Sequence, residues 1–296
     1  MAYELAIGDR SYSSWSLRGW LLFDAFGLPV TLRRYRLYSP EMDDLQRDFA
    51  PALLLPALRL PEGIVIGETL AIAETLAERH PGAGLWPEQA EARAAARYLA
   101  AEMHSGFAAL RGHCAMNLLK SYSDCAPDAA VLADLARIES RWSGARARYG
   151  AGGPWLFGRY SIADAFFAPV AARIAGHNLP VGPDAAAYVA AHLAHPSFRR
   201  WRAMGWAEHV EQPLYRRPWP ERPWPGSVPR QAEPAEGPPL NVRCPYSGKP
   251  VTDFLRLDGR VWGFCNRFCR DKTMADPDAW PAFLAMEANL EAVNHS

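Results

Sequence analysis

The thiols are the first groups in this sequence to consider for chemistry, because five cysteines is an odd number and their distribution is uneven. Three of them, Cys244, Cys265 and Cys269, fall within the last fifty-three residues. This clustering suits reduced thiols or metal ligands better than a framework of disulfide bonds. We therefore expect a reducing compartment, the cytoplasm, and a cysteine-containing unit near the C-terminus.

The second group of interest is the serine pair Ser13 and Ser14, which precedes a helical stretch at 15–26. Gly27 and Pro29 are typical of the end of such a stretch. A serine at this place commonly caps the helix by accepting a backbone N–H. Helix capping alone is therefore one interpretation of the pair.

The elements that must position these groups begin with short strands and helices in residues 1–82. We expect a strand, a helix and a strand, then a hairpin and a second helix, at 3–7, 15–26, 30–38, 53–58 with 64–66, and 68–80. A strand–helix–strand unit implies a parallel pair, and the hairpin adds antiparallel strands to the same sheet. This order predicts a thioredoxin-like α/β domain.

Residues 88–212 are rich in alanine and predict an all-helical domain. Within it, Ser161 and Asp164 have the spacing of a capping box. The stretch 213–239 is dense in proline and carries two Arg-Pro-Trp-Pro units, which favours an extended linker. Its tryptophans either dock on the protein's own surface or recruit a partner. Residues 240–296 then form a small α+β module.

Bulk composition excludes several classes of protein. Lys+Arg and Asp+Glu both number 32, so no net charge attracts nucleic acid or an anionic membrane. The apolar runs are too short to span a bilayer, and the first ten residues lack the pattern of a secretory signal. We expect neither nucleic acid nor a membrane among the partners.

Four short motifs carry a resemblance to a known family. The sequence resembles glutathione S-transferases over about residues 3–210, and its first motif is most similar to the serine-type zeta branch, which includes maleylacetoacetate isomerases. The motifs are Ser11-Tyr-Ser-Ser-Trp-Ser-Leu-Arg18, Leu55-Pro-Ala-Leu58, Glu68-Thr69 and Ser161-Ile-Ala-Asp164. The resemblance implies the glutathione S-transferase fold, glutathione as co-substrate, a small electrophile as second substrate, and a homodimer.

The resemblance also assigns a role to the serines. A serine at the start of the first helix donates its hydroxyl hydrogen to the glutathione thiolate, and the helix N-terminus favours the same anion. Both effects lower the pKa of the thiol. Ser14 fits the family position best, Ser13 is second and Ser11 is third.

For the rest of glutathione, the resemblance implies a cis-proline at Pro56 that presents the backbone of Leu55 to the ligand. It implies that Glu68 pairs with the γ-glutamyl ammonium and that Thr69 binds the γ-glutamyl carboxylate. A trans proline and simple helix capping are the alternatives.

The resemblance places the electrophile pocket along one helix that bears Met103, Phe107 and Arg111, although ordinary core packing is the alternative. His104 and His113 are expected to be surface or hydrogen-bonded histidines.

The C-terminal segment resembles small metal-binding modules of the YHS and TRASH type. The resemblance implies one zinc ion held by Cys244, Cys265 and Cys269. Ser247 stands where relatives often have a fourth cysteine, so Asp271, Asp253 or a water would complete the four ligands. A metal-free module held by aromatic packing and a Cys265–Cys269 dithiol are the alternatives.

Together these observations predict a glutathione-dependent transferase. The rival hypothesis is a non-catalytic scaffold with this fold, whose C-terminal module binds a metal or a partner.

Overall fold

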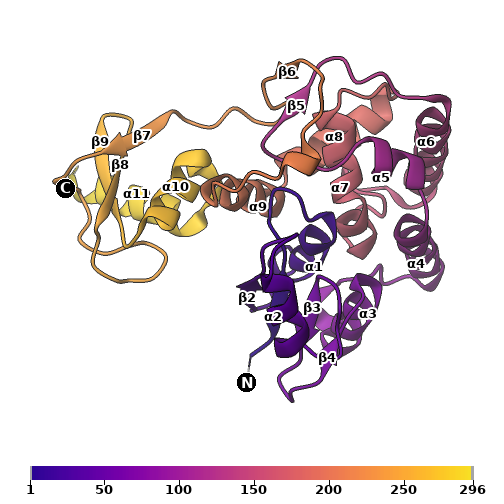
Figure 1. Cartoon of the computed structure of the whole chain (residues 1–296), viewed down its shortest axis with the longest axis horizontal. Helices are drawn as coiled ribbons and strands as arrows, with labels where there is room; N and C mark the ends of the chain where they lie inside the picture. The colour runs from indigo at the N-terminus through magenta and orange to yellow at the C-terminus, as the bar shows by residue number, and fades with distance from the viewer. Residues whose placement is uncertain (1, 295–296) are drawn as a thin grey trace. The chain divides into compact units, whose positions relative to one another are not determined.

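The computed structural model describes residues 2–294 and divides into two compact units (Figure 1). The first comprises Met1–His195 with Gln212–Gly226, and the second comprises Pro196–Glu211 with Ser227–Ser296. No helix in the described part of the chain is long and apolar enough to cross a membrane.

The first unit begins with a four-stranded sheet of order β2-β1-β3-β4. β1 pairs in parallel with β2 and antiparallel with β3, and β3 pairs antiparallel with β4. The elements of this part are β1 (Glu4–Ile7), α1 (Ser14–Asp24), β2 (Thr31–Arg34), α2 (Glu41–Asp48), β3 (Ala57–Arg59), β4 (Val65–Ile66) and α3 (Thr69–Arg79). The predicted thioredoxin-like arrangement is confirmed. The polar stretch 41–48 adds a helix that periodicity alone did not indicate.

Helix α1 is fixed at its first turn and along its buried face. Ser13 is the N-cap, and its side chain accepts the backbone N–H of Ser16. Gly19 faces Pro56 so closely that an added Cβ would lie 2.9 Å from the proline Cγ. A larger residue at this point would push the helix away from the Leu55–Pro56 bond, which is cis.

The helical part of the first unit contains α4 (Ala90–Ser105), α5 (Ala108–His113), α6 (Ala129–Tyr149), α7 (Ile162–Gly176) and α8 (Pro183–Ala194). This all-helical part is confirmed. One detail of the prediction is wrong, because Met103, Phe107 and Arg111 do not share a helix. α4 ends at Ser105 and is capped by Gly106, where a Cβ would lie 2.7 Å from the carbonyl oxygen of Glu102, and Phe107 has a φ of 56°.

Every residue of α7 is buried, and the predicted capping box at its start is present. The Asp164 carboxylate accepts hydrogen bonds from the backbone N–H groups of Leu156 and Ser161 and from the Tyr188 hydroxyl. Because this carboxylate satisfies donors from three places in the chain, it fixes the start of α7.

Residues 213–226 were expected within the linker, but they pack as part of the first unit. Their strand β6 (Glu221–Arg222) pairs with β5 (Ser121–Tyr122), and Trp219 contacts the rings of His113, Tyr122 and His177. A tryptophan ring buries a large apolar area, which outweighs the extended preference of the prolines around it.

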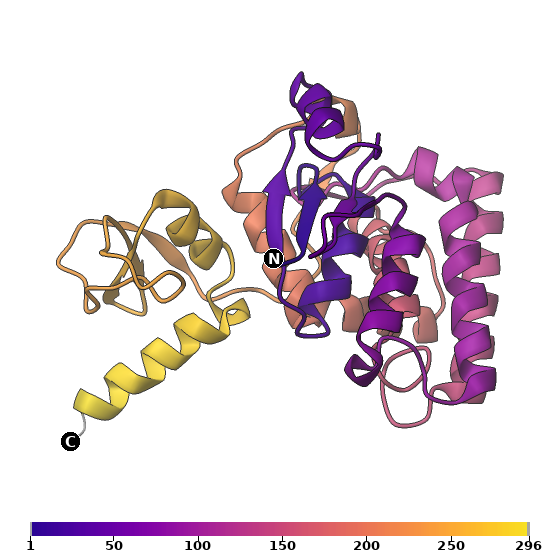
Figure 2. The ribbon, with the colours of Figure 1, turned by 90° about the horizontal axis from the view of Figure 1, so that it is seen from below.

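The described part of the second unit contains an antiparallel sheet of order β7-β8-β9 and three α-helices. Figure 2 shows its last helix, α11, in yellow. The elements are α9 (Pro196–Ala207), β7 (Ala232–Ala235), β8 (Asp253–Leu257), β9 (Arg260–Phe264), α10 (Arg267–Ala275) and α11 (Pro281–Asn294). α9, which was expected in the helical transferase domain, packs on α10 in this unit, where Arg199 forms a bidentate ion pair with Asp276.

Candidate functional site

A cavity of about 890 Å³ opens at the N-terminal end of α1 in the first unit. Its walls come from the residues that begin α1, the loop after β2, Leu54 and Leu55, Arg111 of α5, Arg173 of α7, and Leu214 with Tyr215. The Tyr215 ring packs at a tilt against the Tyr12 ring, with 5.0 Å between the ring centroids, and its hydroxyl lies 3.1 Å from that of Tyr38. The proline-rich segment therefore supplies part of the wall.

The three candidate serines differ in what their hydroxyl groups already do. Ser13 accepts the Ser16 N–H and donates its own hydrogen to the Ser16 Oγ at 2.7 Å, so its donor is used. Ser11 Oγ is buried, has no hydrogen-bond partner in the described part of the chain and does not line the cavity. Ser14 Oγ accepts from Arg173 Nη2 at 3.3 Å and lines the cavity. No described residue accepts its hydroxyl hydrogen, which is therefore available to a ligand.

Three arginines, Arg173, Arg18 and Arg111, lie near the N-terminal end of α1. Arg173 is buried and also donates from Nε to the carbonyl oxygen of Cys114 at 2.9 Å. Arg18 is fully buried and donates to the carbonyl oxygens of Phe166 and Ser14. The guanidinium groups of Arg18 and Arg111 both lie over the ring of Trp15, at 4.3 and 5.0 Å from its centroid.

This concentration of positive charge affects the arginines themselves. Burial, reinforced by the Arg173 and Arg111 guanidiniums, lowers the pKa of Arg18 well below its usual range. Burial, together with Arg111, lowers the pKa of Arg173 to about 10, which leaves it protonated at neutral pH. The hydrogen bonds described for Arg18 and Arg173 all end on uncharged atoms. An anion at Ser14 would therefore be favoured.

The residues expected to hold the rest of glutathione lie at the edge of the sheet and the start of α3. Leu55 lines the cavity, and Thr69 is buried as the first residue of α3. Glu68 has a φ of 60°, which is costly for a residue other than glycine. Its carboxylate lies 3.3 Å from Nε2 of His104, whose ring packs on Trp15. His104 therefore lies between Glu68 and Trp15, which is a residue of the cavity wall.

Of the three predicted pocket residues, only Arg111 lines this cavity. Met103 is buried with its sulfur 3.1 Å from Arg18 Nη2, and Phe107 is buried against Phe167. Both pack in the core because the break at Gly106 ends the common helical face. His113 is half-buried against Trp219.

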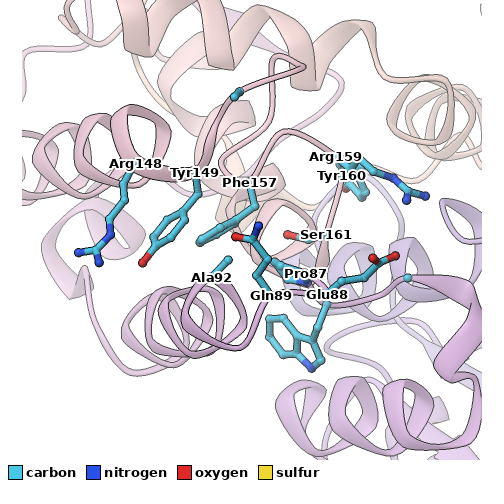
Figure 3. Close-up of a pocket in the computed structure, with 13 residues that line it drawn as sticks. Pro87, Glu88, Gln89, Ala92, Arg148, Tyr149, Phe157, Arg159, Tyr160 and Ser161 are labelled. Carbon is cyan, nitrogen blue, oxygen red and sulfur yellow. The ribbon is translucent and has the colours of Figure 1, made fainter.

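A second cavity, of about 420 Å³, lies beside α4 and the loop before α7 (Figure 3). Tyr149 and Phe157 stack along one side, and Gln89 and Ser161 lie nearby. It shares no lining residue with the Ser14 cavity and contains none of the predicted site residues.

In the second unit the sulfurs of Cys244, Cys265 and Cys269 lie within 4.8 Å of one another. The Cys265 and Cys269 sulfurs are 3.9 Å apart, and the Ser247 hydroxyl donates to Cys265 at 3.2 Å. Burial raises the pKa of the Cys244 thiol, but N–H donors outweigh it and hold that pKa at about 7. Asp271, one candidate for a fourth ligand, is already paired with His209 and Arg270.

Sequence reasoning missed Arg18, Arg173 and Tyr215 as site residues. A signal was present for Arg173, because it is the one charged residue in the otherwise apolar stretch 165–176. Tyr215 carried no such signal, since it lies in a segment whose composition predicted a linker.

Comparison with known proteins agrees with this architecture. Residues 12–79 match the family model of the glutathione S-transferase N-terminal domain. No match was found among curated protein sequences.

Solved structures give a broader likeness. A glutathione transferase homolog from Burkholderia strain BGR1, with bound glutathione, is 25% identical with a TM-score of 0.52, over 69% of this chain and 97% of that one. A glutathione transferase from Methylococcus capsulatus is 24% identical with a TM-score of 0.50, over 69% and 98%. The theta class enzyme from Xanthomonas axonopodis pv. citri, with glutathione bound, is 20% identical with a TM-score of 0.51, over 67% and 96%. The chain has the glutathione S-transferase fold, and about a third of it lies outside these likenesses.

Proposed function

We propose that this chain, with its glutathione S-transferase fold, is a glutathione-dependent transferase. Ser14 activates the thiol of glutathione, and the resulting thiolate attacks a small electrophile. The observation that carries the proposal is the state of the Ser14 hydroxyl. Its oxygen accepts from a buried, protonated Arg173, and Ser14 lines a cavity of substrate size.

The mechanism follows from the hydrogen bonds that the Ser14 hydroxyl accepts and donates. A hydroxyl that already accepts one hydrogen bond is a better donor, because hydrogen bonds in a chain polarise one another. Ser14 then donates to the sulfur, and the positive charges of Arg173, Arg18 and Arg111 stabilise the thiolate more than the neutral thiol. The pKa of the bound thiol falls, and more of the nucleophile exists as thiolate at neutral pH.

The rest of glutathione binds along the edge of the sheet and at the start of α3. The backbone of Leu55 pairs with the cysteinyl unit, Glu68 with the γ-glutamyl ammonium, and Thr69 with the γ-glutamyl carboxylate. The positive φ of Glu68 supports this role, because strained backbone persists where the surroundings hold a residue for a purpose. Arg111 lines the electrophile's side of the cavity.

Several finer features belong to the same proposal. The serine motif at 11–18 supports a zeta-like, isomerase-related subtype, and the resemblance to the family supports a homodimer. The five free cysteines support a reducing compartment, the cytoplasm. The convergence of Cys244, Cys265 and Cys269 supports a zinc site in the second unit.

The second candidate function is a non-catalytic scaffold that binds a metal or a partner through this cysteine module. The clustered thiols favour it. Retention on immobilised glutathione, followed by a conjugation assay with a panel of electrophiles, separates the two. Retention with turnover supports the transferase, and neither retention nor turnover supports the scaffold.

The serine mechanism is tested by titrating the thiolate absorbance of bound glutathione. Ser14→Ala should bind glutathione nearly as well as the wild type but raise the pKa of its thiol. Ser13→Ala is the matched control, since its hydroxyl is committed to Ser16. If only Ser13→Ala raises the pKa, the assignment is wrong by one position; if neither does, serine activation is wrong.

A further inference from the structure

A second group of metal-ligating side chains lies in the first unit, separate from the C-terminal cysteine module. The ligand atoms of His113, Cys114 and Cys125 all lie within 4.8 Å of one another. Cys114 and Cys125 are both buried, and their sulfurs are 3.9 Å apart. The Nε2 atom of His113 is buried and has no hydrogen-bond partner among the described residues.

We propose that His113, Cys114 and Cys125 bind a zinc ion. The type of ligand fits, because two thiolates and an imidazole are among the ligand sets that zinc prefers. The charge fits as well, since two thiolates neutralise the ion where a bare cation would be costly.

The distances agree with this assignment. Zinc–sulfur bonds of about 2.3 Å in a tetrahedron place two sulfurs roughly 3.8 Å apart. The observed separation of 3.9 Å is close to that value. A disulfide bond would require the same sulfurs to approach to about 2.05 Å.

The surroundings explain how such a site would be shielded from bulk solvent. Trp219 packs on the His113 ring at 5.6 Å and belongs to the first Arg-Pro-Trp-Pro unit. The proline-rich segment thus covers the ligands, and an orphaned imidazole nitrogen beneath it gains a partner when the ion binds. Three protein ligands leave the fourth position of the tetrahedron to a water molecule.

The ion would have a structural role beside the candidate active site. The carbonyl oxygen of Cys114 accepts from Arg173 Nε, and the same guanidinium donates to Ser14. Ala115 and Met116, which follow Cys114, line the cavity. Zinc at this point would fix the backbone that positions Arg173.

Zinc content of the full-length chain tests the proposal. The protein is saturated with Zn²⁺, dialysed against a weak chelator and measured by elemental analysis. The matched variants are Cys114→Ala/Cys125→Ala and, in the C-terminal cluster, Cys265→Ala/Cys269→Ala. We expect the first variant to hold one zinc fewer per chain than the wild type, whatever the second variant holds.

His113→Ala provides a variant that leaves both buried thiols in place. It should release zinc to a competing chelator at an at least tenfold lower chelator concentration than the Cys265→Ala/Cys269→Ala variant does, with an unchanged circular dichroism spectrum. Equal zinc content in the wild type and Cys114→Ala/Cys125→Ala would overturn the proposal. So would unchanged zinc release in His113→Ala, or an intact mass lower by two hydrogens with a Cys114–Cys125 cross-link.

Discussion

Replacing Arg173 with glutamine tests whether buried positive charge, and not only the Ser14 hydroxyl, activates the thiol. Glutamine keeps a neutral N–H donor on a shorter side chain and removes the charge. The native guanidinium lies 3.3 Å from Ser14 Oγ and is protonated at neutral pH. Its loss should therefore raise the pKa of glutathione bound at Ser14.

The size of the effect follows from the geometry. A sulfur that accepts from Ser14 lies about 3.3 Å beyond Oγ, and hence roughly 6 Å from the guanidinium. Two unit charges at that distance interact with about 2.8 kcal/mol at an effective dielectric constant of about 20. Since about 1.4 kcal/mol corresponds to one pKa unit, the thiol pKa should rise by about two units.

The assay is the pH dependence of thiolate absorbance in the glutathione complex, with the dissociation constant measured in parallel. Arg173→Lys is the control, because it retains the charge and should leave the thiol pKa much closer to the wild-type value. A melting temperature near that of the wild type excludes a misfolded α7. If Arg173→Gln binds glutathione and titrates it at the wild-type pH, the electrostatic reasoning is refuted.

Three further predictions concern binding, stability and domain structure. Glu68→Ala should weaken glutathione binding by about 1–3 kcal/mol in calorimetry, the cost of a charge-assisted hydrogen bond, whereas Glu62→Ala on the exposed surface should leave it unchanged. Burial lowers the pKa of His192 to about 3, because the folded state disfavours the protonated imidazole. The fold therefore has its full stability from this residue above pH 6.5, where the imidazole is neutral in the folded and unfolded states. That contribution is lost as the pH falls, by about 2 kcal/mol at pH 5, and denaturant unfolding of His192→Phe should lack this part of the pH dependence. A chain that ends at Gly226 should stay soluble and bind glutathione, whereas one that ends at Gln212 should melt at a lower temperature because it lacks Tyr215 and Trp219. Equal melting temperatures would show that this segment adds no stability.

The fold could be predicted because its signals are local. Ser13 before an apolar helix and the Ser161–Asp164 pair each predict where a helix begins. In the structure, α1 and α7 begin at these two places. The break between α4 and α5 was not predicted, because the helical spacing of apolar residues continues across it. Only the approach of Gly106 to the Glu102 carbonyl reveals it, and that contact depends on three-dimensional geometry.

The proline-rich segment shows a different limit of sequence reasoning. Composition predicted an extended chain without a core of its own, and that part of the argument is sound for 213–226 taken alone. The segment packs because another part of the fold offers it a surface, with Tyr122 and His177 against Trp219. A surface formed by residues distant in the sequence cannot be predicted from the sequence of the segment that packs on it.

The arginines around Ser14 were missed for the same reason, and their energetics connect the fold to the proposed chemistry. Taking a guanidinium out of water costs several kcal/mol, and a carboxylate partner is the usual compensation. The described hydrogen bonds of Arg18 and Arg173 instead reach carbonyl oxygens, a thioether sulfur and the Ser14 hydroxyl. Apolar side chains of similar volume would pack these positions without that cost. The uncompensated charge lowers the free energy of an anion that reaches Ser14 and does nothing for a neutral molecule. A site built in this way distinguishes the thiolate from the thiol, which is the difference that a glutathione-dependent transferase requires.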